Sequence, residues 1–190
     1  MNFLGHAYFS PPNNDKALAG NVFGDFVKGN LEKQNFPDDI KKGLQYHRYL
    51  DALCDKCAGF ISFKHLLSND YSHYKGIIAD ILIDHLLARE WHYFSGIPLE
   101  EFSEITSRKL ESCISFFPPR VSRIFNFMQN ENWFILYSFP GFIEDTLKRI
   151  ERYSGHGIII STAVSEFLCN QEKFSEQFFL FIKEMKEHTK

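Results

Sequence analysis

The chain has 190 residues, 44% of them hydrophobic and 21 of them phenylalanine, which is enough apolar material for a sizeable core. Its formal net charge of −3 argues against a protein that binds nucleic acid through a strongly basic surface. The sequence contains no run approaching the ~20 apolar residues of a membrane span. We therefore expect one domain over residues 1–190, located in the cytoplasm, with neither nucleic acid nor membrane as partner.

The four cysteines are too few and too scattered for a disulfide framework. Cys54 and Cys57 form a C-x-x-C pair, but no second pair or nearby pair of histidines completes a zinc site. The β–α–β pattern of thioredoxin-like proteins is also missing, so reduced thiols are expected. The start, MNFLGHAYFSPP, lacks the basic region of a signal peptide, and His6 interrupts its apolar run.

Segments of helical length and period account for almost the whole sequence. Residues that end helices cluster at 10–14, 29–39, 95–98, 117–119, 139–141 and 153–157. The run HGIIISTAV, residues 156–164, is rich in β-branched residues but has no partner run, so we expect helix or irregular structure there. The predicted fold class is all-α, a single-domain helical bundle.

The stretch GNVFGDFVKGN, residues 20–30, places a carboxylate in an apolar pattern. Val22, Asp25 and Phe26 follow Leu18 with the spacing of one helical face. The pattern predicts a helix that continues through Asp25 and turns its carboxylate toward the core.

The next helix should begin at Asp38 or Asp39, which can cap it, and run to about Lys56. His47 and Asp51 lie one turn apart in this helix and are predicted to face inward. The same face also carries Leu44, Leu50 and Cys54.

Ionisable residues also interrupt two other apolar segments. GIIADILIDHLLAREW contains Asp80 and Asp84, one turn apart, and His85 follows directly. Near the N-terminus, His6 lies within NFLGHAYF.

Two later helices are expected to be ordinary structural elements. Residues 95–98 introduce a helix whose first turn holds Glu100 and Glu101, the charge that favours a helix N-terminus. The tail from residue 171 to 190 predicts an amphipathic helix that packs on the body of the protein. Its apolar side consists of Phe174, Phe178, Phe181, Ile182 and Met185.

Burial of an ionised carboxylate is unfavourable unless it is paired, hydrogen-bonded or bound to a metal. Taken singly, each residue has an ordinary explanation: a histidine satisfied in the core, or an aspartate that caps a helix or pairs with Arg48 or Arg89. Five or six such residues in the first half of one helical chain favour a shared cation, with the histidines bound as neutral imidazoles. A mixed aspartate and histidine set favours Mn²⁺, Fe²⁺ or Mg²⁺ over structural zinc.

Four motifs resemble one known family when taken in order and at their separations. The motifs are MNFLGH, GNVFGDFVKGN, HRYLD and DHLLAREW, and together they are similar to the acyl carrier protein phosphodiesterases, also called acyl-carrier-protein hydrolases. The similarity continues weakly through FNFMQNENWFILY and GFIEDTLKRI and fades after about residue 155.

The resemblance implies both a fold and an activity. The family is helical and is regarded as a divergent relative of the HD-type metal phosphohydrolases. Its members remove the 4′-phosphopantetheine arm from holo-acyl carrier protein with a divalent cation, typically Mn²⁺. By resemblance, Asp25 of GDFVKGN is essential to this metal-dependent chemistry. In or beside the same site the resemblance places His6, His47, Asp51, Asp80, Asp84 and His85.

The chain also departs from the family pattern. Some relatives begin with a small apolar-His-x-His sequence, whereas this chain has Tyr8 two positions after His6, so the second histidine is absent. The consecutive His-Asp of HD enzymes proper does not occur, because residues 84–85 read Asp-His. Ligand roles therefore do not transfer directly from HD enzymes.

The predicted mechanism centres on a cation that polarises a phosphoryl oxygen and lowers the pKa of a bound water to give a hydroxide nucleophile. The predicted ligands are His6, Asp25, His47 and Asp84. Asp51 and Asp80 are predicted as supporting or alternative ligands.

Other residues are predicted to serve the substrate. His85 is the candidate general acid for the departing serine alkoxide. Lys28 and Arg48 either offset the phosphate charge or act as ordinary surface cations.

Holo-acyl carrier protein is the partner that the resemblance implies. Carrier proteins are acidic, and the segments KGNLEK and DIKKG offer basic residues for docking. Two other functions stay open: a related phosphohydrolase acting on a small nucleotide or another phosphodiester, and a non-catalytic helical module that binds a carrier protein or another partner. The sequence does not fix the oligomeric state.

Overall fold

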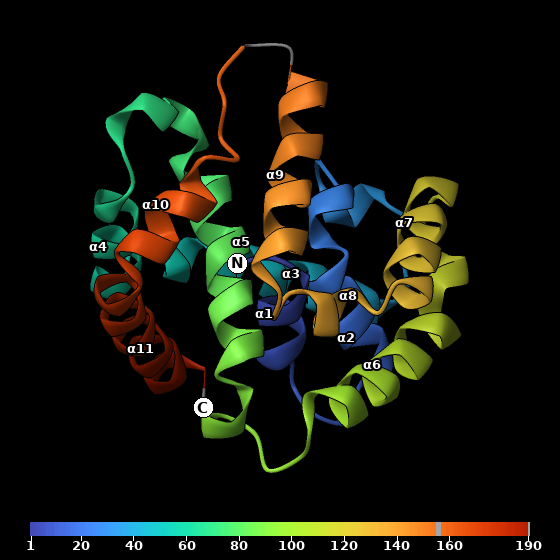
Figure 1. The fold of residues 1–190 in the computed structure, drawn as a ribbon. Coiled ribbons are helices and arrows are strands. Elements are labelled where there is room, and N and C mark those ends of the chain that lie inside the picture. Colours follow the sequence, from blue (N-terminus) through green and yellow to red (C-terminus); the bar gives the residue numbers. More distant parts are fainter. Residues whose placement is uncertain (155–156, 190) are drawn as a thin grey trace. The chain divides into compact units, whose positions relative to one another are not determined.

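The computed structural model describes residues 1–154 and 157–189. Over these residues every regular element is a helix, with eleven α-helices and five short 3₁₀-helices (Figure 1). The all-α prediction is therefore confirmed. The chain divides into two compact units, and the single domain stays a prediction.

The first unit comprises residues 3–52 and 90–136. Its α-helices are α1 (Phe3–Tyr8), α2 (Asp15–Val22), most of α3 (Asp38–Cys54), α6 (Leu99–Cys113), α7 (Pro119–Asn130) and α8 (Trp133–Leu136). Its 3₁₀-helices are η1 (Gly24–Phe26), η2 (Leu31–Lys33), η4 (Trp91–Tyr93) and η5 (Ile114–Phe116). Helix α2 contacts both α1 and α6, and α8 contacts α6 and α7.

The second unit comprises residues 1–2, 53–89 and 137–190. Its helices are α4 (Ala58–Leu66), η3 (Asn69–Tyr74), α5 (Lys75–Arg89), α9 (Pro140–Ser154), α10 (Ala163–Cys169) and α11 (Gln171–His188). Helix α4 lies along α11, as Figure 1 shows, and α5 contacts α4, α9 and α11. Phe63 of α4 and Phe174 of α11 meet edge to face with ring centroids 4.8 Å apart, a favourable aromatic geometry.

Helices α2 and α3 approach closely because small residues lie at their crossing. A Cβ atom added to Gly20 would collide with the backbone of Ile40 and Leu44 on α3. Conversely, a Cβ atom on Gly43 would collide with the backbone of Ala17 on α2. This reciprocal glycine contact brings the end of α2 against the middle of α3, where His47 lies.

The structure corrects the prediction for Asp25. Helix α2 ends at Val22, and Asp25 lies in the 3₁₀ turn η1 with 64% of its side chain exposed rather than facing the core. The chain changes to i→i+3 hydrogen bonds here, because the amides of Phe26 and Val27 donate to the carbonyls of Phe23 and Gly24. Helical spacing in the sequence therefore continues beyond the helix itself.

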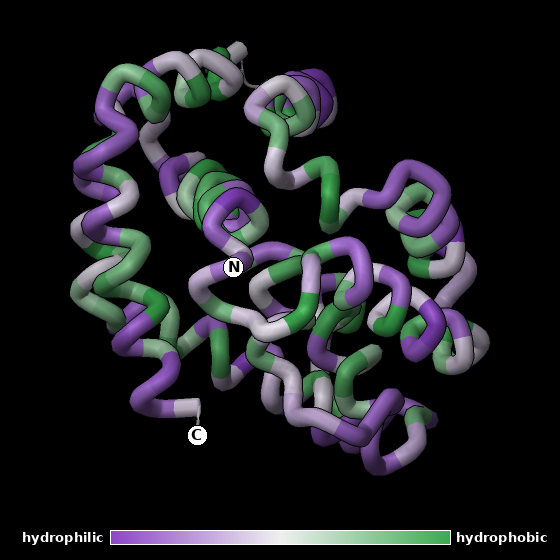
Figure 2. Tube along the Cα trace, turned by 60° about the horizontal axis from the view of Figure 1, so that its bottom comes forward, coloured by the Kyte–Doolittle hydropathy of each residue, from purple (hydrophilic) through white to green (hydrophobic). Residues whose placement is uncertain are grey.

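The other predicted elements agree with the structure. Helix α3 spans Asp38–Cys54 and α6 has Glu100 and Glu101 in its first turn. Residues 158–160 are irregular before α10 begins, as expected, while residue 156 of that run lies outside the described residues. Helix α11 buries the five predicted apolar residues, and hydrophilic and hydrophobic bands alternate along it (Figure 2).

The cysteines are free thiols, as predicted. Burial raises the pKa of Cys54 to about 12 and that of Cys57 to about 11, so both thiols stay protonated near neutral pH. The Cys57 thiol donates a weak hydrogen bond to the Met185 sulfur at 3.7 Å.

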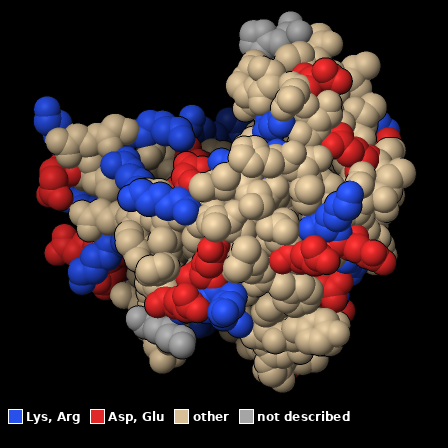
Figure 3. Space-filling model, turned by 90° about the vertical axis from the view of Figure 1, so that its left-hand side faces the viewer, with Lys and Arg blue, Asp and Glu red and all other residues tan. Residues whose placement is uncertain are grey.

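Within the described part of the chain, every helix is too short or too polar to cross a bilayer. On the face drawn in Figure 3, basic and acidic side chains are interspersed, and neither sign covers the face.

Candidate metal centre

Two buried histidines of the first unit form the centre of the candidate site. His6 comes from α1 and His47 from α3, and they are 2% and 3% exposed. Their rings stack with centroids 4.0 Å apart and an angle of 22° between the ring planes. Two helices far apart in the sequence thus present their imidazoles side by side.

The carboxylate of Asp51 bridges the two rings. Its Oδ1 lies 3.2 Å from His6 Nε2, and its Oδ2 lies 3.1 Å from His47 Nε2. One ligand atom from each of these three residues lies within 4.8 Å of the other two. The side chain of Asp51 is 44% exposed, so the cluster is closed on the histidine side and open to solvent on the carboxylate side.

Asn21, which is fully buried near the end of α2, contacts both histidines on the opposite side of their rings. The Nδ1 of His47 lies 2.7 Å from the main-chain oxygen of Asn21. The Nδ1 of His6 lies 3.0 Å from the side-chain Oδ1 of Asn21. Carbonyl oxygens only accept hydrogen bonds, so both histidines carry a proton on Nδ1.

Asp25 reaches the edge of the cluster from η1. Its Oδ1 lies 3.7 Å from His47 Nε2, and the amine of Lys28 lies 3.8 Å from the same oxygen. This approach requires a glycine before Asp25, because a Cβ atom on Gly24 would collide with the His47 ring. Gly20 and Gly24 thus both permit close approaches to α3.

Electrostatics couple the ionisation of these groups. Burial opposes protonation of His47, but Asp25 and Asp51 outweigh it and raise the pKa of His47 to about 9. Burial, the largest effect, lowers the pKa of His6. Burial would raise the pKa of Asp51, but the adjacent imidazoles of His47 and His6 hold it well below its ordinary value. The nearby imidazole of His47 likewise lowers the pKa of Asp25.

The donor set fits a divalent cation. The Nε2 atom of His6 is buried without a hydrogen bond, although it lies 3.2 Å from Asp51 Oδ1. With Nδ1 protonated, neutral His6 and His47 would each direct an Nε2 lone pair toward the Asp51 side. Two imidazoles with one or two carboxylates are typical ligands of Mn²⁺ or Fe²⁺. His6, His47, Asp51 and, at the edge, Asp25 are therefore the residues that could hold the ion.

The remaining predicted ligands belong to the second unit. Asp80 pairs with the α-amino group of Met1 at 2.8 Å, and Asp84, fully buried, accepts the main-chain N–H of Asn2 at 3.2 Å. His85 is 1% exposed, and its Nδ1 donates to the carbonyl of Tyr137 at 2.7 Å. The participation of Asp80 and Asp84 in a metal centre, and the role of His85 as general acid, stay predictions.

The two predicted phosphate-binding cations are exposed on the first unit. Lys28 is 79% exposed, and the exposed Arg48 donates to the Gly29 carbonyl at 2.8 Å. Arg120 of α7 donates to the Phe26 carbonyl. We call Lys28, Arg48 and Arg120 the basic rim, because all three contact the segment around and just after Asp25.

Sequence reasoning missed Asn21 and Arg120. Asn21 was visible as the polar residue in the otherwise small and apolar run ALAGNVF, four positions before Asp25. Arg120 carries no comparable signal, because it is 94 residues from its partner Phe26 in the sequence.

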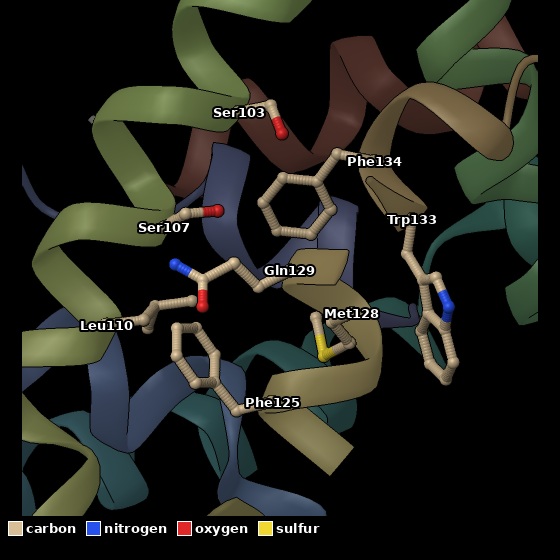
Figure 4. Close-up of a pocket in the computed structure, with 8 residues that line it drawn as sticks. All are labelled: Ser103, Ser107, Leu110, Phe125, Met128, Gln129, Trp133 and Phe134. Carbon is tan, nitrogen blue, oxygen red and sulfur yellow. The ribbon is translucent and has the colours of Figure 1, made fainter. Parts of the chain in front are cut away.

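A separate small pocket lies between α6, α7 and α8 (Figure 4). Ser107 lies near the amide of Gln129, Ser103 lies near the ring of Phe134, and that ring points into the middle of the pocket. Its free volume of about 10 Å³ is room for one water molecule, so it does not accommodate a substrate.

Comparison with known proteins identifies the family. The protein-family model described as "Acyl carrier protein phosphodiesterase" matches residues 1–185. The chain belongs to the acyl carrier protein phosphodiesterase family.

Curated relatives carry the same name. An "Acyl carrier protein phosphodiesterase" of Photorhabdus laumondii is 30% identical over 188 residues, which cover 98% of this chain and 94% of the relative. A protein of that name from Escherichia coli O45:K1 is 31% identical over 148 residues, covering 77% of this chain and 76% of the relative. No solved structure matches the chain significantly.

Proposed function

We propose that this protein hydrolyses the phosphodiester between a carrier-protein serine and 4′-phosphopantetheine, releasing the arm from holo-acyl carrier protein. The observation that carries the proposal is the cluster of His6, His47 and Asp51, buried on one side and open on the other, in a chain of this family. The proposal includes a divalent cation, Mn²⁺ by preference, and a cytoplasmic location.

The residues of the cluster have distinct roles in this proposal. A bound cation supplies a Lewis acid for a phosphoryl oxygen and lowers the pKa of a coordinated water. His6 and His47 would hold such an ion through Nε2, and Asp51 would hold it through its carboxylate. Asp25, on the exposed turn beside His47, completes the ligand set or orients the attacking water.

The basic rim supports binding of an anionic substrate. Lys28, Arg48 and Arg120 place three cations around the segment next to Asp25. They offset the charge of the diester phosphate, and they attract the acidic surface of a carrier protein.

Aromatic residues beside the cluster offer an apolar contact surface for the phosphopantetheine arm. Phe3 lies one turn before His6 in α1, and its ring stacks on Phe26 with centroids 6.2 Å apart. Trp133 packs against Phe3 at 5.9 Å. All three side chains are partly exposed, so they can cover the alkyl part of pantetheine.

A proton donor for the departing serine alkoxide is still required. His85 remains the sequence-based proposal for this role, and Asp84 remains a proposed ligand. The relation of the fold to HD-type phosphohydrolases is also part of the proposal, because the helical content and a histidine–aspartate cluster are compatible with it.

Incubation of the protein with holo-acyl carrier protein and Mn²⁺, followed by intact-mass spectrometry, tests the proposal. Loss of the phosphopantetheine mass is expected from the wild type and not from Asp51→Asn. An intact arm with the wild-type protein loaded with metal would contradict the assignment, and a panel of small phosphodiesters would then identify a different substrate.

A further inference from the structure

We propose that Asn21 is a positioning residue that fixes the proton on Nδ1 of both His6 and His47 and so leaves both Nε2 atoms for a cation. The inference rests on the metal centre of the proposed function. Asn21 contacts only the rear of the rings, so it acts through the histidines rather than on the substrate.

The orientation of the Asn21 amide follows from its surroundings. Its Nδ2 lies 2.7 Å from the carbonyl oxygen of His6 and 2.8 Å from the hydroxyl of Ser10. That hydroxyl donates its own proton to the His6 carbonyl at 2.9 Å, so it accepts from Asn21. Both amide protons are thus engaged, and Oδ1 must face the imidazole of His6.

This orientation determines the tautomer of His6. Oδ1 is an acceptor, so the hydrogen bond of 3.0 Å requires the proton on His6 Nδ1. The Nε2 atom of His6 then carries a lone pair, and this buried atom has no hydrogen bond. An acceptor behind a histidine commonly orients it toward a metal.

The main chain of Asn21 determines the tautomer of His47. Asn21 lies in the last turn of α2, where carbonyl groups have no partner within the helix. Its free carbonyl accepts from His47 Nδ1 at 2.7 Å. A helix continuing through Asp25 would instead use this carbonyl for the amide of Asp25. The end of α2 at Val22 therefore gives His47 its acceptor.

Substitution of Asn21 should affect His6 but not His47, because His6 contacts the Asn21 side chain whereas His47 contacts its main-chain oxygen. Asn21→Leu removes the acceptor of His6 but keeps the carbonyl that faces His47. Asn21→Asp keeps an acceptor for His6 and loses the amide donors. Ser10→Ala is the matched control, because it removes a partner of the Asn21 amide without touching either ring.

Long-range ¹⁵N–¹H NMR of the histidine rings reads the tautomers directly. In the metal-free wild type we expect His6 to be protonated on Nδ1, and in the Zn²⁺-loaded protein we expect the same of both histidines. Asn21→Leu should shift His6 toward Nε2–H in the metal-free protein and weaken Zn²⁺ binding by about 10- to 100-fold. Asn21→Asp and Ser10→Ala should retain the wild-type His6 tautomer.

The results that would contradict the role of Asn21 differ from those that would contradict the proposed function. Nε2–H on His6 in the metal-free wild type, or an unchanged His6 tautomer and Zn²⁺ affinity in folded Asn21→Leu, would overturn the role of Asn21. Failure of the wild type to bind Zn²⁺ or to cleave holo-carrier protein would overturn the proposed function, while the tautomer of His6 would still decide the role of Asn21.

Discussion

Histidines in the two units are held in the same way but lie in different surroundings. His47 of the first unit and His85 of the second each donate from Nδ1 to a main-chain carbonyl at 2.7 Å. The carboxylates beside them differ: the Asp51 side chain is 44% exposed, whereas Asp84 is fully buried. A fixed imidazole therefore does not by itself mark a ligand site. In the first unit the half-exposed carboxylate leaves the cluster open to solvent.

Replacement of Asp51 by Asn removes the exposed carboxylate of the first unit and should have the largest effect. The amide removes the charge that faces both Nε2 atoms, so Mn²⁺ affinity and turnover should each fall by more than about 100-fold, beyond the loss usual for a supporting residue. Calorimetric Mn²⁺ titration and the carrier-protein mass assay measure this. Asp39→Asn on the same helix, whose carboxylate pairs with Lys42, is the control and should change neither. Equal metal affinity in both variants would show that Asp51 is not a ligand.

A pair of glycine substitutions separates stability from function in the first unit. Gly20→Ala should lower the free energy of unfolding by about 1–3 kcal/mol, because the new methyl group meets the α3 backbone. Gly24→Ala meets the His47 ring instead, so it should weaken Mn²⁺ binding more than Gly20→Ala does. Urea unfolding and metal titration of both variants give the two quantities.

Gly76→Ala in α5 is the control for this pair, because open space surrounds the added methyl group. It should leave metal binding unchanged and raise the free energy of unfolding by up to about 1 kcal/mol. If Gly24→Ala binds Mn²⁺ as tightly as Gly76→Ala does, the close approach to His47 has no role in the centre.

Replacement of Asp84 by Ala tests the role of the buried carboxylate in the second unit. The main-chain N–H of Asn2 loses its carboxylate acceptor, so the free energy of unfolding should fall by about 1–3 kcal/mol. Urea denaturation of the metal-free protein measures this loss. A free energy of unfolding equal to that of the wild type would show that the hydrogen bond from Asn2 to Asp84 does not stabilise the fold. Mn²⁺ titration of the folded variant decides the sequence-based proposal, because reduced affinity would add Asp84 to the ligand set.

The smallest expected effect is a pH dependence that arises in the open cluster. The folded-state pKa of His47 is about 9, above its ordinary value of 6.5. Protonated His47 therefore stabilises the metal-free fold fully below about pH 6.5, and this contribution is lost as the pH rises through 9. Urea unfolding in the presence of a chelator at pH 6, 7.5 and 9 should follow that decline, and His47→Gln should flatten it. If the free energy of unfolding of His47→Gln falls equally steeply with pH, other titratable groups cause the decline.

The sequence predicted the helical class and most helix limits, because caps, breakers and apolar spacing are local signals. It also placed His6, His47 and Asp51 among the candidate site residues. It failed at Asp25, since the spacing of apolar residues continues past Val22 whereas the helix does not. The cause is tertiary: the last turn of α2 gives the Asn21 carbonyl to His47, a contact between residues 26 apart.

The grouping of the candidates also depends on tertiary structure. The sequence favours Asp25 over Asp51 as a ligand, yet Asp51 bridges both histidines and Asp25 lies at the edge. Spacing along one helix predicted that His47 and Asp51 are neighbours, but it contains no information on the ring of His6, 41 residues away from His47.

Two arginines are attached to the backbone of the segment that follows Asp25. Arg48 and Arg120 come from different helices and donate to the carbonyls of Gly29 and Phe26. An exposed turn without such attachments would be an easy target for proteases. With its carbonyls held from both sides, this turn should resist cleavage and exchange its amide protons slowly for a surface segment. The exposed side chain of Asp25 is thus carried on backbone that is already ordered before any partner binds.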